Sequence, residues 1–240
     1  MPAPQKHAER SLYRGAIMTG NNDMIFCKEE ALSNAEIDRA TFRLLAAFYN
    51  YNPDRNFIEA LMNLTSGSVP MNGISSAVSM ITKYACEAVR SDELVIELKR
   101  DWTKLFRGVA PDYGPKAPYE QLYVNSGSLK LISVLAQEYQ CNGFAEYMEI
   151  NNRHDYIGTE LAYAAHLASL RLTALETENF EEYSKYQDMS DSFIENHPAN
   201  WVGMFCEEAE KHAATDFYRG VLKLTSLTVT AKGGSDEFLF

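Results

Sequence analysis

Apolar residues recur at steps of three and four along most of the chain, the spacing that places side chains on one face of a helix. The clearest such stripe has five members: Leu94, Leu98, Trp102, Leu105 and Phe106. Ser91 and Asp92 stand at its start, and Gly108 fits the position just past its end, where a left-handed residue is favoured. The pattern therefore predicts a helix with defined ends.

The same spacing predicts further helices over residues 33–50, 53–64, 74–89, 127–139, 141–148, 156–176, 180–195 and 201–229. Ser33 and Glu36 are spaced as a capping box, and Pro53 and Pro198 fit the first turns of their helices. Residues 67–73 read as a break, and only residues 227–231 resemble a strand, too short to build a sheet. We predict an all-α, single-domain bundle of about eight to ten helices.

One irregular segment, residues 110–118, contains three prolines and a glycine, which exclude regular helix or strand. Long loops carried by a rigid scaffold often hold functional residues, so we expect the functional site there. We divide the chain into a partly ordered N-terminal extension (1–32), the helical domain (33–231) and a loose tail (232–240).

Charge and composition exclude several functions. The 240 residues include 22 Lys and Arg against 33 Asp and Glu, a net charge of −11. Such a balance disfavours nucleic acid and anionic membrane surfaces as partners. No secretory signal or membrane span is visible, so we expect a cytoplasmic protein. The four cysteines lie more than fifty residues apart, which favours free thiols although an even number leaves disulfides open.

Motifs for several enzyme classes are missing from the sequence. No Glu stands three residues before any of the five histidines, and no His-Glu-x-x-His occurs, which argues against di-iron and zincin sites. Phosphate-binding glycine loops and a Gly-x-Ser-x-Gly elbow are missing too. Glu208 and His212 share a helix face and could form one edge of a metal site, but a surface ion pair is the commoner case. We expect no cofactor, no metal and no catalysis.

Acidic residues are concentrated between positions 176 and 195, where seven Asp and Glu accompany only Lys185, a net charge of −6. Two interpretations remain open. The segment can be a solvated helix face, or it can be a docking surface for a basic peptide.

Four segments in order carry a family resemblance: residues 101–108 (DWTKLFRG), 117–123 (APYEQLY), 155–161 (DYIGTEL) and 193–201 (FIENHPANW). Together they resemble the TorD/DmsD/NarJ family of molybdoenzyme-specific chaperones. That family has Leu-Phe-x-Gly, then Pro-Tyr-Glu-Ser-x-Tyr, then Asp-His followed by Glu-Leu, then Phe-x-x-x-His-x-x-x-Trp. The resemblance covers roughly residues 35–230, with Gln121 at the usual Ser position and Tyr156 at the usual His position.

The resemblance implies a cytoplasmic, all-helical chaperone that is not an enzyme. Such a protein binds the twin-arginine signal peptide or N-terminal region of a molybdopterin oxidoreductase subunit until cofactor insertion is complete. Carried over by motif, three residues would form the apolar wall of the peptide groove: Trp102, Leu105 and Phe106. Four would shape the adjacent loop: Pro118, Tyr119, Glu120 and Tyr123. Three would lie at the groove's mouth: Asp155, Tyr156 and Glu160.

The chemistry of such a peptide agrees with these residues. Arginine presents a planar fork that pairs bidentately with a carboxylate, so Asp155 and Glu160 are candidate partners for it. Two other functions stay open: a helical adaptor without peptide binding, and a small hydrolase with an unrecognised pocket. Monomer and homodimer are both compatible with the sequence.

Overall fold

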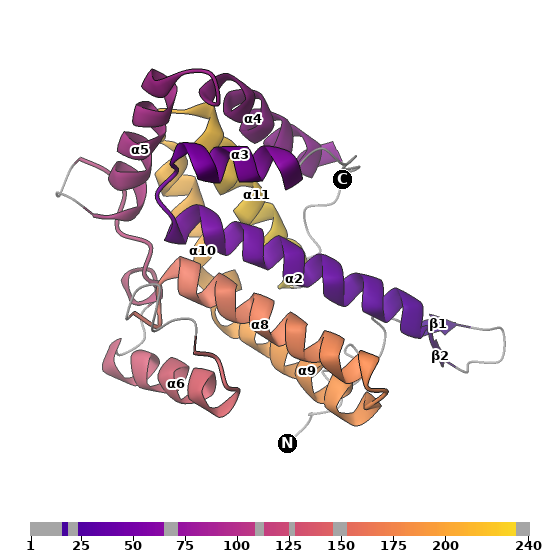
Figure 1. Ribbon diagram of the computed structural model, residues 1–240. Coiled ribbons are helices and arrows are strands. Elements are labelled where there is room, and N and C mark those ends of the chain that lie inside the picture. Colours follow the sequence, from indigo (N-terminus) through magenta and orange to yellow (C-terminus); the bar gives the residue numbers. More distant parts are fainter. Residues whose placement is uncertain are drawn as a thin grey trace.

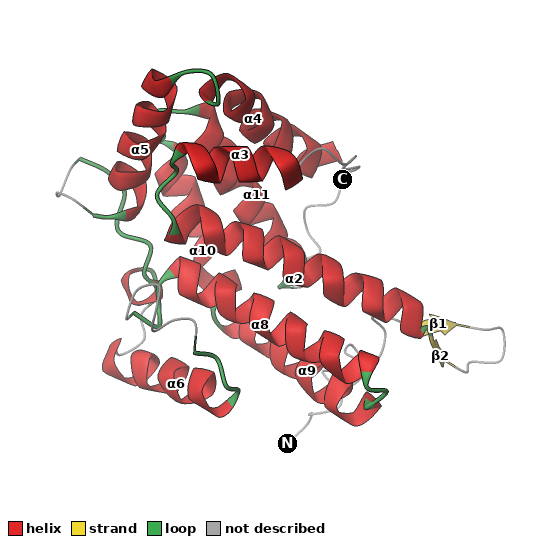
Figure 2. Ribbon diagram, in the orientation of Figure 1, coloured by secondary structure: helices red, strands yellow, loops and turns green. Residues whose placement is uncertain are grey.

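The computed structural model describes residues 16–18, 24–64, 72–108, 113–124, 128–145 and 153–233 (Figures 1 and 2). This part of the chain contains nine α-helices, one short 3-10 helix and two short strands. The prediction of an all-α fold is confirmed. No helix in the described ranges has both the length and the apolar character needed to cross a membrane.

The elements follow one another as α2 (Lys28–Asn50), α3 (Arg55–Leu64), α4 (Asn72–Ala88), α5 (Asp92–Phe106), η1 (Glu120–Leu122), α6 (Ser128–Cys141), α8 (Ile157–Glu176), α9 (Phe180–Asn196), α10 (Pro198–Glu210) and α11 (Asp216–Lys232). Strands β1 (Ala16–Met18) and β2 (Met24–Phe26) precede them and pair antiparallel. In Figure 1 the indigo α2 runs beside the orange α8, with α9 behind α8, while α4 packs on α11.

Several predicted helix ends are confirmed. The Ser91 hydroxyl accepts a hydrogen bond from the Leu94 amide at 3.3 Å and so caps α5. Gly108 has φ of 57°, the left-handed conformation expected just past a helix. Pro198 occupies the first turn of α10.

Other boundaries differ from the predictions. The capping box at Ser33 is wrong, because α2 begins at Lys28 and Ser33 lies inside it. Buried Ala31 and Ala35 extend the apolar face of α2 across this first turn onto the end of α8. The helix predicted over 141–148 does not include residues 142–145, because α6 ends at Cys141 and these four residues are not helical. The break at 67–73 falls mainly on residues outside the described part, as do 110–112, 146–148 and most of the two predicted terminal segments.

The single helix predicted over 201–229 is two helices, and the strand-like residues 227–231 are helical. The turn between α10 and α11 is held by Asp101 of α5, which is almost completely buried. Its carboxylate accepts hydrogen bonds from the amides of Ala214 and Thr215 at 2.9–3.1 Å and from the Thr215 hydroxyl at 2.7 Å. These bonds satisfy the free donors at the start of α11, which explains why the chain can stop and restart its helix without glycine or proline.

The core is rich in aromatic side chains whose polar ends find partners. Tyr49 donates to the Thr225 hydroxyl at 2.8 Å, and Trp102 donates to the Phe48 carbonyl at 3.2 Å. Tyr156 donates to the Tyr49 carbonyl at 2.8 Å. These bonds link α2, α5, α11 and the start of α8, so they hold the far ends of the sequence against one another.

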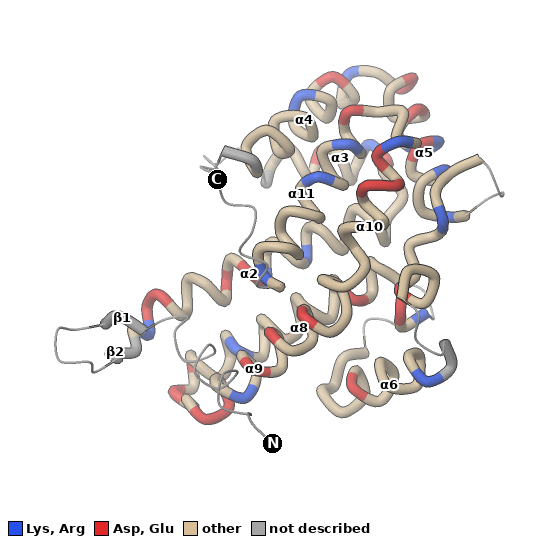
Figure 3. Tube along the Cα trace, turned by 180° about the vertical axis from the view of Figure 1, so that it is seen from behind, with Lys and Arg blue, Asp and Glu red and all other residues tan. Residues whose placement is uncertain are grey.

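The acidic segment 176–195 lies mostly on α9 (Figure 3). Glu181 and Glu182 are exposed in its first turn, where negative charge interacts favourably with the helix dipole. Glu178 pairs with Lys28 at 2.8 Å, which lowers the pKa of Glu178. Part of the acidic charge of this segment therefore stabilises the fold, and docking of a basic peptide on it stays a prediction.

Candidate functional site

The Pro-rich loop and the residues before α8 form one unit. Tyr119 and Tyr156 are joined in an isolated antiparallel bridge, and their rings lie 5.5 Å apart. The Glu120 amide donates to the Asp155 carbonyl at 2.9 Å, and the Ile157 amide donates to the Pro118 carbonyl at 3.0 Å. Five of the residues singled out from the sequence therefore meet at one place: Pro118, Tyr119, Glu120, Asp155 and Tyr156.

Asp155 is completely buried and holds a guanidinium group. Arg153 donates to both of its carboxylate oxygens, from Nε at 3.0 Å and from Nη2 at 2.8 and 2.9 Å. The same guanidinium lies 4.2 Å from the centre of the Tyr119 ring. A buried carboxylate and an aromatic face thus form a complete arginine-binding site, whose occupant is the chain's own Arg153, about a third exposed.

Two further carboxylates are buried beside Asp155. Glu120 lies 3.0 Å from Nδ1 of His197, and Glu160 accepts a hydrogen bond from Nε1 of Trp201 at 3.0 Å. The other oxygen of Glu160 is buried and receives no hydrogen bond from an N–H group, so its available neighbour is the Glu120 carboxylate. Burial raises the pKa of Glu160 well above its usual value, and the neighbouring charges of Glu120 and then Asp155 raise it further. Glu160 therefore keeps its proton to a higher pH than an exposed glutamic acid does, and the proton can be shared with Glu120.

This protonation predicts an unusual dependence of stability on pH. Folding makes Glu160 take up a proton above its ordinary pKa, so the free energy of unfolding falls as pH rises, by up to about 1.4 kcal/mol per pH unit. Glu160→Gln keeps an acceptor for Trp201 and carries no charge. At pH 8 we expect this variant to be more stable than wild type by about 1 kcal/mol or more, and so to unfold at a higher denaturant concentration. At pH 5 we expect the variant and wild type to unfold at similar denaturant concentrations. Equal stability of Glu160→Gln and wild type at pH 8 would refute the link between the raised pKa of Glu160 and stability. The same gain from the exposed-site variant Glu93→Gln would refute it too.

The predicted apolar wall lies inside the core. Trp102, Leu105 and Phe106 are at most 5% exposed. The Phe106 ring packs 4.9 Å from that of Tyr49, and the Arg107 guanidinium covers the Trp102 ring at 4.8 Å. In this conformation the three side chains stabilise the fold and have no surface free for a peptide.

The remaining predicted residues lie around the arginine-binding site. Tyr123 is half-buried, stacks on Trp201 at 5.5 Å and donates to the Lys116 carbonyl at 2.9 Å. Tyr156 and Glu160 are buried below the surface, not at an open mouth. Sequence reasoning missed Arg153, which stands two residues before Asp155. It also gave no role to His197 and Trp201, although both belong to the fourth motif.

Metal and thiol chemistry find little support here. Across the described ranges no group of three His, Cys, Asp or Glu side chains could hold a metal ion. Glu208 accepts a hydrogen bond from the Lys116 amide at 3.3 Å, so its carboxylate contacts the Pro-rich loop. All four cysteines are free, and burial raises the pKa of Cys206 to about 12, so this thiol is unreactive at neutral pH.

Comparison with known proteins agrees with the motifs. A family model described as nitrate reductase delta subunit matches residues 72–207, more than half of the chain. The match spans all four motif segments and ends within α10. No curated protein matches the sequence. The chain belongs to the nitrate reductase delta subunit family, a branch of the TorD/DmsD/NarJ maturation chaperones, which act with the catalytic subunits of molybdoenzymes.

Proposed function

We propose that this chaperone binds an arginine-bearing N-terminal segment or twin-arginine signal peptide of a molybdoenzyme catalytic subunit. It would hold the segment in the cytoplasm until the molybdenum cofactor is inserted and, where the enzyme is exported, until export can begin. The observation that supports this most is the bidentate pairing of buried Asp155 with a guanidinium group stacked on Tyr119.

In this proposal an arginine of the client replaces Arg153. The carboxylate of Asp155 is fully buried while Arg153 covers it, so a client arginine gains access only as Arg153 leaves. The exchange keeps Asp155 paired throughout, which avoids the large cost of a buried unpaired charge. Arg153 is the partner that can be exchanged, because about a third of its side chain already contacts water whereas Asp155 is fully buried.

The apolar part of the client would rest on the loop beside this site. Leu122 is an exposed large apolar side chain there, at 44%, and Tyr119 and Tyr123 are partly exposed. Tyr113, at 59%, stands at the other end of the loop, beside Lys104 of α5. Exposed aromatic and aliphatic side chains around a buried polar anchor are typical of peptide-binding surfaces. The three residues beside the site replace Trp102, Leu105 and Phe106 as the proposed apolar contacts.

A variant of Arg153 tests the exchange. Arg153→Gln removes the competing guanidinium, and we expect a peptide with paired arginines and an apolar run to bind about tenfold more tightly than to wild type. A peptide with lysines in place of the arginines should gain less, because lysine lacks the planar fork. Calorimetric titration measures both affinities. Arg219→Gln, at an exposed ion pair, is the control; unchanged or weaker binding to Arg153→Gln would argue against the exchange.

A further inference from the structure

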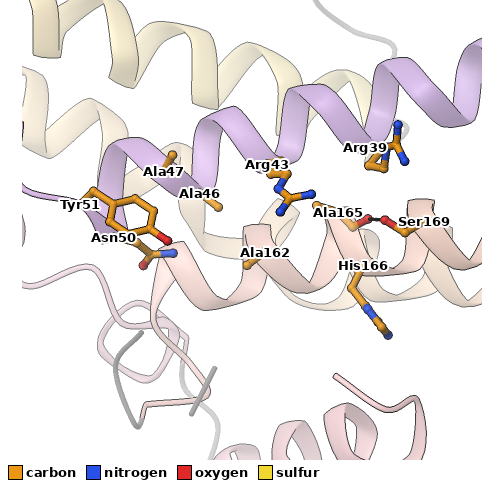
Figure 4. A pocket seen from close by; sticks show the side chains of 10 residues that line it. All are labelled: Arg39, Arg43, Ala46, Ala47, Asn50, Tyr51, Ala162, Ala165, His166 and Ser169. Atoms are coloured by element: carbon orange, nitrogen blue, oxygen red, sulfur yellow. Dashed lines mark hydrogen bonds between the residues drawn. The ribbon is translucent and has the colours of Figure 1, made fainter. Parts of the chain in front are cut away.

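A groove with a positive wall lies between α2 and α8. Its cavity of about 370 Å³ is lined from α2 by Arg39, Arg43, Asn50 and neighbouring residues, and from α8 by His166 and Ser169. Four alanines form much of the remaining lining. Figure 4 shows Arg43 reaching from α2 toward the space above α8, with Arg39 one turn further along.

The two arginines of this groove lie one helical turn apart beside a cavity and lack a carboxylate partner among the described residues. Other described arginines also lack one: Arg90, Arg100 and Arg107. Arg55, Arg153, Arg171 and Arg219 each pair with a carboxylate. Arg39 and Arg43 contact no carboxylate of the described residues, although acidic residues outnumber basic ones by 33 to 22. Their spacing of four also places like charges side by side on one helix face, which costs a few tenths of a kcal/mol. Two uncompensated guanidinium groups beside a cavity fit an anionic ligand.

The groove begins next to the arginine-binding site. At its near end Asn50 donates to the Gly158 carbonyl at 3.0 Å, and Gly158 follows Asp155 by only three residues. A Cβ atom at Gly158 would collide with the Asn50 amide, so a side chain there would displace this hydrogen bond. From Asn50, Arg43 and Arg39 lie about 10 and 16 Å further along α2, at 1.5 Å per residue. An extended peptide covers these distances in about three to five residues.

We infer that the groove binds an acidic residue of the same client segment whose arginine occupies the Asp155 site. This inference rests on the proposed function and adds a requirement to it. The client would carry Asp or Glu at least three to five residues from its arginine, and that carboxylate would pair with Arg43 or Arg39. Opposite charges at the two ends of the bound segment would fix its direction and register on the protein.

Matched peptides test this inference on the full-length chain. One peptide carries a glutamate four residues from its arginine, and the other carries glutamine there. Because the pairs are partly exposed, we expect wild type to prefer the glutamate peptide about fivefold at low salt, and less at physiological salt. The double variant Arg39→Gln/Arg43→Gln should bind both peptides equally. Lys83→Gln/Arg90→Gln, at two exposed basic residues on and just after α4, is the control with the same loss of charge and should keep the preference.

The outcomes separate this inference from the proposed function. If wild type binds neither peptide, the proposed function fails. If wild type binds both equally, or if Arg39→Gln/Arg43→Gln keeps the preference, the groove assignment is wrong while peptide binding stands. Inorganic pyrophosphate that binds wild type but not Arg39→Gln/Arg43→Gln, without any discrimination between the peptides, would assign the groove to a small anion and overturn the client contact.

Discussion

Asp155→Asn is expected to weaken binding of an arginine-bearing client peptide by about thirtyfold or more, which corresponds to roughly 2–5 kcal/mol for a buried charge partner. The asparagine keeps the size of the side chain but removes the charge that makes the bidentate pairing strong. Calorimetry at low and physiological salt measures the loss. The free protein should remain folded, because Arg153 is partly exposed and can be solvated when its partner is neutral.

Glu181→Gln is the matched control for this experiment. Glu181 is exposed on α9, so the variant makes the same change in net charge far from any buried pairing. We expect at most a small effect, weaker still at higher salt. An equal loss in both variants would show that the overall negative charge attracts the peptide, and would contradict a specific arginine site at Asp155.

Asp101→Ala is expected to lower the free energy of unfolding by about 3–5 kcal/mol. Its carboxylate receives hydrogen bonds from two amides and a hydroxyl at the start of α11, and truncation leaves the buried amide and hydroxyl of Thr215 without this acceptor. Denaturant titration should show a lower midpoint with an unchanged slope. Asp92→Ala, at an exposed ion pair on the same helix, should cost less than about 1 kcal/mol. A similar small cost at Asp101 would refute its role at the α10–α11 turn.

Local signals in the sequence were sufficient for most helices. The cap at Ser91 and the left-handed Gly108 act through neighbouring residues, so both ends of α5 could be predicted. The break between α10 and α11 could not, because it depends on Asp101, more than a hundred residues earlier. The predicted capping box at Ser33 was wrong because the same residue pattern also occurs inside helices. Here the buried face of α2 continues toward the N-terminus through Ala31.

The candidate site was predictable in part for a similar reason. The motifs indicated that the loop residues and Asp155 belong together, and the structure joins them by backbone hydrogen bonds. An aromatic stripe such as that of Trp102 and Phe106 is compatible with a groove wall and with a core, and only the packing of distant helices decides between them. The pairing of Arg153 with Asp155 could not be predicted from helical spacing, because both residues lie in a turn before α8.

The most direct test of the account is recovery of a client by the intact protein. Affinity-tagged wild type and Asp155→Asn would be purified from cells that express molybdoenzymes, and bound proteins identified by mass spectrometry. We predict that wild type retains a molybdoenzyme catalytic subunit and that Asp155→Asn retains much less of it at equal yield of folded chaperone. Absence of such a subunit from the wild-type sample, or equal recovery by both proteins, would contradict the account.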